Sequence, residues 1–65
     1  MKNLKEQFAE NNNHLIISDN DNQLEIFDNK RDEKISVRFN GSILAHGSWN
    51  IAEKKFIELK SKHGL

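Results

Sequence analysis

The stretch KISVRFNGSILAHG, residues 34–47, decides the fold of this chain. Apolar and polar residues alternate over 34–39, and this period of two is typical of a strand with one buried and one solvated face. The Asn40-Gly41 pair is a strong hairpin signal, because these residue types tolerate the positive φ angles of a tight turn. Residues 42–47 then return as a second strand. We therefore predict an antiparallel hairpin over 34–47.

The sequence leaves the register of this hairpin open. A two-residue loop pairs Val37 with Leu44 and turns Ile43 away from the core. A three-residue loop with a bulge pairs Val37 with Ile43 instead, and it places Leu44 and His46 on the outer face. Either register leaves an aliphatic side chain on the less buried side. This pattern points to a second packing partner for the hairpin.

The remaining segments complete the predicted domain. Asn3 is expected to cap a short first helix, and Asn50 is expected to cap a last helix, with Glu53 at its capping-box position. We predict a single α+β domain over residues 1–65, in the order α-β-β-β-β-α. It has an antiparallel meander of three to four strands, with the C-terminal helix packed on one sheet face. The predicted bounds are helices at 3–11 and 50–62 and strands at 14–18, 23–28, 34–39 and 42–47.

Composition limits the classes of function. The chain has 65 residues and no cysteine, so it has neither disulfides nor thiolate metal ligands. Hydrophobic residues make up only 35% of it, and so lean a core favours stabilisation by a partner, either another protein or a second copy. The N-terminal region has no signal-peptide pattern and no apolar run is long enough to cross a bilayer. We therefore expect a cytoplasmic protein that does not enter membranes.

Charge is balanced overall and divided along the chain. The formal net charge is zero, which argues against a protein that binds nucleic acid mainly by charge. Residues 14–33 carry six acidic and two basic residues, whereas residues 34–65 carry six basic and two acidic ones. This asymmetry can orient a partner or pair internally across the fold.

Motifs for metal binding or catalysis fail on inspection. The Asp19–Gln23 segment alternates oxygen ligands as a calcium loop does, but Leu24 and Lys30 occupy the positions that require Gly and Glu. The three histidines have no ligand spacing and no cysteine to assist them. No nucleophile motif is present, and so short a chain offers little depth for a pocket. We predict no metal, no cofactor and no enzymatic activity.

A basic strand face and one tryptophan are the candidate binding features. Lys34 and Arg38 line the outer face of one strand, and Leu44 and His46 join them in one of the two registers. Trp49 lies at the junction between strand and helix, where it either covers the core or anchors an interface. We predict that these five residues bind a partner.

The favoured function is that of a small binding protein acting by protein–protein contact. The chain is rich in asparagine, which is typical of proteins encoded by AT-rich genomes. This composition suggests a phage or mobile-element protein that inhibits or modulates a host or bacterial-defence protein. One alternative is a nucleic-acid-binding domain. A basic sheet face followed by a helix resembles, in layout alone, AP2-like and phage-integrase arm domains, although their arginine-rich and aromatic strand pattern is missing here. The other alternative is a homodimerising structural subunit.

Overall fold

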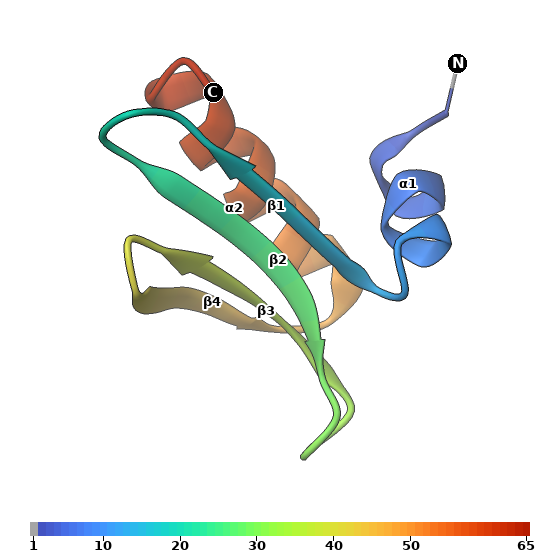
Figure 1. Cartoon of the computed structure of the whole chain (residues 1–65). Coiled ribbons are helices and arrows are strands. Elements are labelled where there is room, and N and C mark those ends of the chain that lie inside the picture. Colours follow the sequence, from blue (N-terminus) through green and yellow to red (C-terminus); the bar gives the residue numbers. More distant parts are fainter. Residues whose placement is uncertain (1) are drawn as a thin grey trace.

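A four-stranded antiparallel sheet and one long helix form the two layers of the computed structural model, which describes residues 2–65 (Figure 1). The strands neighbour one another in chain order, β1-β2-β3-β4, so each consecutive pair is a hairpin. This arrangement confirms the predicted order α-β-β-β-β-α with the C-terminal helix on one sheet face. The elements are α1 (Leu4–Glu10), β1 (His14–Ser18), β2 (Gln23–Asn29), β3 (Lys34–Phe39), β4 (Ser42–Gly47) and α2 (Trp49–Lys62).

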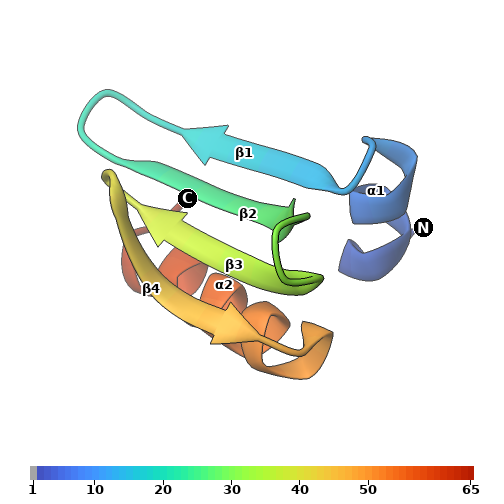
Figure 2. The same cartoon turned by 90° about the horizontal axis from the view of Figure 1, so that it is seen from below.

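The core lies between α2 and the inner face of the sheet. Because side chains alternate along a strand, β2 turns Leu24 and Ile26 inward, and β3 adds Val37 beside them. The helix supplies Ala52, Phe56 and Leu59, which recur at helical spacing. Figure 2 shows α2 on one side of the sheet only. The face that α2 does not cover is called the open face below.

Aromatic contacts close the two ends of this core. At one end α1 buries Phe8 against Trp49, with 4.9 Å between the ring centroids. At the other end His63 stacks on Phe39, with 4.5 Å between the centroids. The first helix therefore packs on the domain, as its Phe8 joins the core cluster. The predicted cap of α1 is confirmed, because the Glu6 backbone N–H donates to Asn3 Oδ1 over 2.8 Å.

The predicted N-cap of α2 was wrong by two residues. Ser48, not Asn50, is the N-cap, with an extended backbone at φ −67° and ψ 165° and no side-chain capping bond. Trp49 is the first helical residue, and its ring packs against Phe8. The strand-to-helix junction is tight, since a Cβ on Gly47 would lie 3.3 Å from Cδ1 of Ile51.

The hairpin register differs from both predicted alternatives. Beside the Asn40-Gly41 turn, Arg38 pairs with Ile43, as a two-residue loop requires. A bulge then shifts the ladder, so Val37 pairs with Ala45 and Leu44 is the extra residue. The bulge brings Ala45 into contact with the core and leaves Leu44 exposed.

The C-terminal helix is amphipathic and carries positive charge at its C-terminal end. Its 14 residues end with Lys60 and Lys62 in the last turn, where positive charge complements the negative end of the helix dipole. Within residues 2–65, no helix combines the length and the apolar character that crossing a membrane requires.

Candidate functional site

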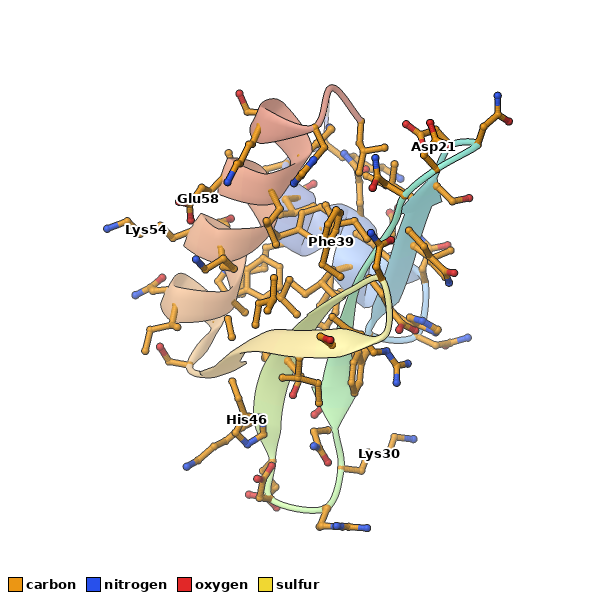
Figure 3. The ribbon with its side chains drawn as sticks, turned by 90° about the vertical axis from the view of Figure 1, so that its left-hand side faces the viewer. Asp21, Lys30, Phe39, His46, Lys54 and Glu58 are labelled. Atoms are coloured by element: carbon orange, nitrogen blue, oxygen red, sulfur yellow. The ribbon has the colours of Figure 1, made fainter. Side chains whose placement is uncertain are left out.

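The open face of the sheet gathers side chains from all four strands in two rows. The strand registers place Ile16, Glu25, Arg38 and Ile43 side by side across the sheet. The next row consists of His14, Phe27, Ser36 and His46. Figure 3 shows the difference between the faces at β3 and β4, with Phe39 between the layers and His46 on the opposite side.

Glu25 is the centre of the first row and is buried although no helix covers it. Only 6% of the residue is exposed. Arg38 Nε donates to its carboxylate over 2.7 Å, and Arg38 Nη2 lies 2.5 Å from the same oxygen. His14 Nε2 contacts the other oxygen. The Arg38 guanidinium also lies 5.0 Å from the centre of the Phe27 ring. The long side chains therefore lie flat on the sheet and exclude water from Glu25.

The charge of Glu25 is stabilised by its partners. Burial by itself raises the pKa of this carboxyl, because the charged form loses hydration. The hydrogen bonds and charges of Arg38 and His14 outweigh the burial and hold the pKa of Glu25 below its usual value. Glu25 is therefore ionised at neutral pH, and a buried ion pair sits at the centre of the open face.

The second row contains a chain of hydrogen bonds from Ser36 to Asp32. His46 Nδ1 lies 2.6 Å from Ser36 Oγ, and His46 Nε2 lies 2.7 Å from Asp32 Oδ2. The bond from His46 lowers the pKa of Asp32. An ionised carboxylate can only accept a hydrogen bond, so His46 Nε2 carries a proton and donates a hydrogen bond to Asp32. In the neutral ring Nδ1 then accepts from the Ser36 hydroxyl.

The Ser36, His46 and Asp32 side chains are the residue types of a hydrolytic triad, and hydrogen bonds join them in that order. Ser36 is fully buried under His46, so its hydroxyl does not face solvent in this structure. A nucleophile must reach the substrate carbonyl within about 3–3.5 Å. The arrangement instead fixes the His46 ring on the sheet. It ties the β2–β3 turn, which carries Asp32, to β4.

The five residues predicted to bind a partner fall into three places. Lys34, Arg38 and His46 lie on the open face. Leu44 lies at the β4 edge beside Ile51 and Lys54 of α2. Trp49 is half-buried against Phe8, in the role of covering the core. The structure thus brings three of the five together and separates the other two from them.

Other members of the open face were missed by sequence reasoning. Ile16 and Ile43 stand at its two sides, with 52% and 53% of each residue exposed. His14, Glu25 and Phe27 lie between them. The period-two pattern of residues 14–18 and 23–28 indicates which of these side chains share a strand face. The strand order was the further signal needed to place them beside Arg38.

The Asp19–Asn22 turn is held by its own hydrogen bonds. Asp19 Oδ1 accepts from the backbone N–H groups of Asp21 over 2.9 Å and Asn22 over 2.7 Å. These bonds lower the pKa of Asp19 and make the segment a side-chain-stabilised turn. Within residues 2–65, no group of three or more His, Asp or Glu side chains is arranged to hold a metal ion.

Comparisons with protein-family models, with curated proteins and with solved structures gave no match to this chain.

Proposed function

We propose that this protein is a small binding module that acts by protein–protein contact through the open face of its sheet. The observation that carries the proposal is the pair of exposed isoleucines, Ile16 and Ile43, on either side of a fixed, charge-compensated centre. Interfaces of this kind combine apolar contacts with charged groups that are already positioned, so little ordering is needed on binding.

The fixed centre supports specific recognition. Arg38 is held between Glu25 and Phe27, and His46 is held between Ser36 and Asp32. A partner therefore meets side chains with defined positions, which lowers the entropic cost of binding. Arginine and aromatic residues with these surroundings are typical anchors of protein interfaces.

The same contacts favour a protein partner over nucleic acid. The Arg38 guanidinium already pairs with Glu25, so its charge is largely compensated. It also covers Phe27, which reduces the ring surface open to a stacked base. A sheet that binds single-stranded nucleic acid needs free aromatic rings and uncompensated cations.

The test is capture of partners on the immobilised protein, with a matched pair of variants. Ile43→Asp places a charge at the side of the open face, whereas Ile51→Asp places one at an equally exposed site on α2. We expect a stoichiometric protein partner to be retained by the wild type and by Ile51→Asp. Ile43→Asp should weaken its binding at least about tenfold, as loss of an interface contact worth roughly 1.4 kcal/mol does.

Two outcomes would overturn the proposal. In the first, Ile43→Asp binds the captured protein as tightly as Ile51→Asp does. In the second, the protein retains DNA or RNA with an affinity that falls steeply with salt, which would support the nucleic-acid alternative. The finer proposal, a phage or mobile-element inhibitor of a host or bacterial-defence protein, rests on composition. The identity of the captured protein tests it.

A further inference from the structure

The two edges of the sheet differ in how they are protected. β4 carries the bulge at Leu44, and Lys54 and Lys55 of α2 line the surface beside it. Bulges and lysines are devices that prevent edge strands from pairing with other chains. β1 has neither of them, since its residues pair one to one with β2 and none is an aspartate, glutamate, lysine or arginine. β1 is thus the edge on which another strand can be added.

Backbone groups of β1 point away from the sheet in a regular pattern. Asn13 C=O accepts from the Asp28 N–H over 3.1 Å, and the Asp19 N–H donates to Asn22 C=O over 2.9 Å. In an antiparallel ladder every second residue bonds to the neighbouring strand. The odd-numbered residues therefore face β2, and His14, Ile16 and Ser18 direct their N–H and C=O groups outward.

We propose that β1 pairs antiparallel with β1 of a second copy of this chain, forming a continuous sheet around a two-fold axis at Ile16. This register uses all the outward groups, because Ile16 faces Ile16 and His14 faces Ser18 of the second copy. Between these pairs, Leu15 faces Ile17 of the second copy, with side chains closer together than in the hydrogen-bonded pairs. Self-pairing thus matches apolar residues at the three central positions of the strand and places His14 opposite Ser18 at both ends.

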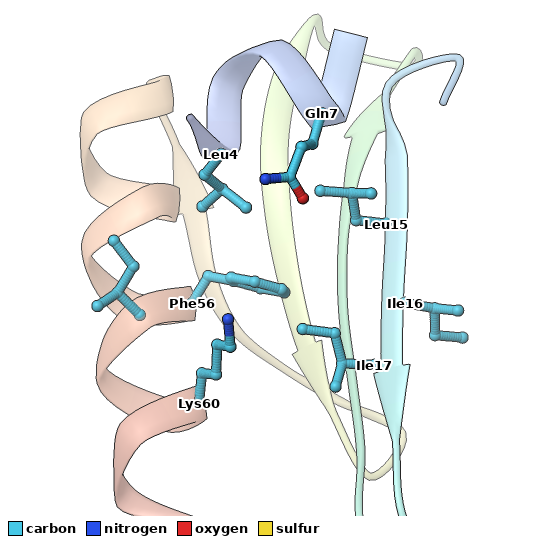
Figure 4. Close-up of a pocket in the computed structure, with 8 residues that line it drawn as sticks. Leu4, Gln7, Leu15, Ile16, Ile17, Phe56 and Lys60 are labelled. Carbon is cyan, nitrogen blue, oxygen red and sulfur yellow. The ribbon is translucent and has the colours of Figure 1, made fainter. Parts of the chain in front are cut away.

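An apolar groove lies next to the proposed interface. It has a volume of about 440 Å³ and its apolar lining comes from Leu15 and Ile17 of β1 and from α1 and α2. Figure 4 shows Gln7 toward the α1 end of the groove and Lys60 farther along α2. A two-fold axis at Ile16 would bring the two grooves together across the paired strands. Because these strands would run antiparallel, the Gln7 end of one groove would lie on the same side as the Lys60 end of the other.

Charge also distinguishes this pairing from self-association at β4. The surface beside β4 is lined by Lys54, Lys55 and Glu58, so two copies meeting at their β4 edges would have to accommodate these charged side chains. When two β1 strands pair, neither strand carries an aspartate, glutamate, lysine or arginine. The inference concerns self-association and does not depend on the proposed contact through the open face.

Sedimentation of the full-length protein over a range of concentrations provides the first test. We expect a species with twice the 7.6 kDa chain mass, dissociating on dilution. Ile16→Lys places two charges at the two-fold axis and should weaken dimerisation at least about tenfold. Ile43→Lys is the matched control, because Ile43 is the same residue type with nearly equal exposure at the opposite side of the open face. It should dimerise as the wild type does.

Single-cysteine variants test the register. The chain has no cysteine, so Ile16→Cys carries one thiol and can be cross-linked only to a second copy. Facing residues of a hydrogen-bonded antiparallel pair have Cα atoms about 5.5 Å apart, within the range of a disulfide. Mild oxidation should therefore cross-link Ile16→Cys much faster than Ile43→Cys.

The results that would overturn the inference differ from those that bear on partner binding. A wild type that sediments as a monomer at all concentrations would exclude the dimer. Equal weakening by Ile16→Lys and Ile43→Lys, or faster cross-linking of Ile43→Cys, would place any association at another surface. Circular dichroism of each variant confirms that the monomer fold is retained.

Discussion

Replacing Phe56 with alanine is expected to remove most of the folding stability of this protein. Phe56 is the largest fully buried side chain and lies between α2 and the sheet. Truncation of a buried phenylalanine costs about 3–5 kcal/mol, because the apolar contacts are lost and a cavity remains. At roughly 0.05–0.15 kcal/mol per residue, a domain of this size has a total free energy of unfolding of only about 3–10 kcal/mol. The melting temperature should fall by at least about 15 °C.

The adjacent residue supplies the control for this prediction. Ile57 follows Phe56 on the same helix but is 51% exposed, so Ile57→Ala should cost less than about 1 kcal/mol. Urea unfolding followed by circular dichroism measures both variants in one experiment. Equal losses in the two would mean that α2 does not pack through the face that buries Phe56.

Much of the fold could be predicted because local and long-range signals agree. The alternation over residues 34–39 and the Asn40-Gly41 turn specify a hairpin without any knowledge of the partner strands. The same alternation over residues 14–18 and 23–28 correctly places Leu24 and Ile26 on one face. A meander follows because short turns between such strands favour pairing of neighbours.

The β4 register could not be predicted because two local requirements conflict. The Asn40-Gly41 turn sets the pairing of Arg38 with Ile43, while Ala45, which packs against the core, lies opposite Val37. One extra residue, Leu44, resolves the conflict as a bulge. Its position depends on how α2 lies on the sheet, and no sequence pattern within 42–47 contains that information.

The candidate site was predicted only in part for a related reason. Lys34, Arg38 and His46 could be placed on an outer face by alternation along single strands. Their neighbours Glu25 and Phe27 belong to another strand, so their role emerges only with the pairing of β2 and β3. The sequence also suggested free positive charge along β3. In the fold the charge of Arg38 is compensated by Glu25.

Arg38→Met is the variant expected to reveal how strongly this ion pair stabilises the fold. It leaves the Glu25 carboxylate buried, with His14 as the partner that remains. Removing one member of a fully buried pair costs about 3–5 kcal/mol. The Arg38 side chain is 43% exposed, so water reduces the effect, and we expect a loss of about 2 kcal/mol near pH 7. Lys34→Met, on the same strand and face, should cost less than about 0.5 kcal/mol.

The pH dependence of this loss identifies its cause. The folded-state pKa of Glu25 lies below its usual value, so its ionised form stabilises the fold above the unfolded pKa, and that contribution disappears as the pH falls through the folded pKa. Once Glu25 is protonated it is neutral, so its ion pair with Arg38 no longer contributes to the free energy of unfolding. The difference in unfolding free energy between wild type and Arg38→Met should therefore shrink as the pH falls from about 5 toward 3.

The Glu25→Gln variant distinguishes the ion-pair contribution of Arg38 from its packing contribution to the free energy of unfolding. Glu25→Gln stays neutral at every pH, so in that background the cost of Arg38→Met should be small and independent of pH. Urea unfolding of the four proteins at a series of pH values gives this comparison directly. A cost of Arg38→Met that stays constant with pH when Glu25 is present would contradict the ion-pair explanation. The contact between the Arg38 side chain and Phe27 would then account for the loss.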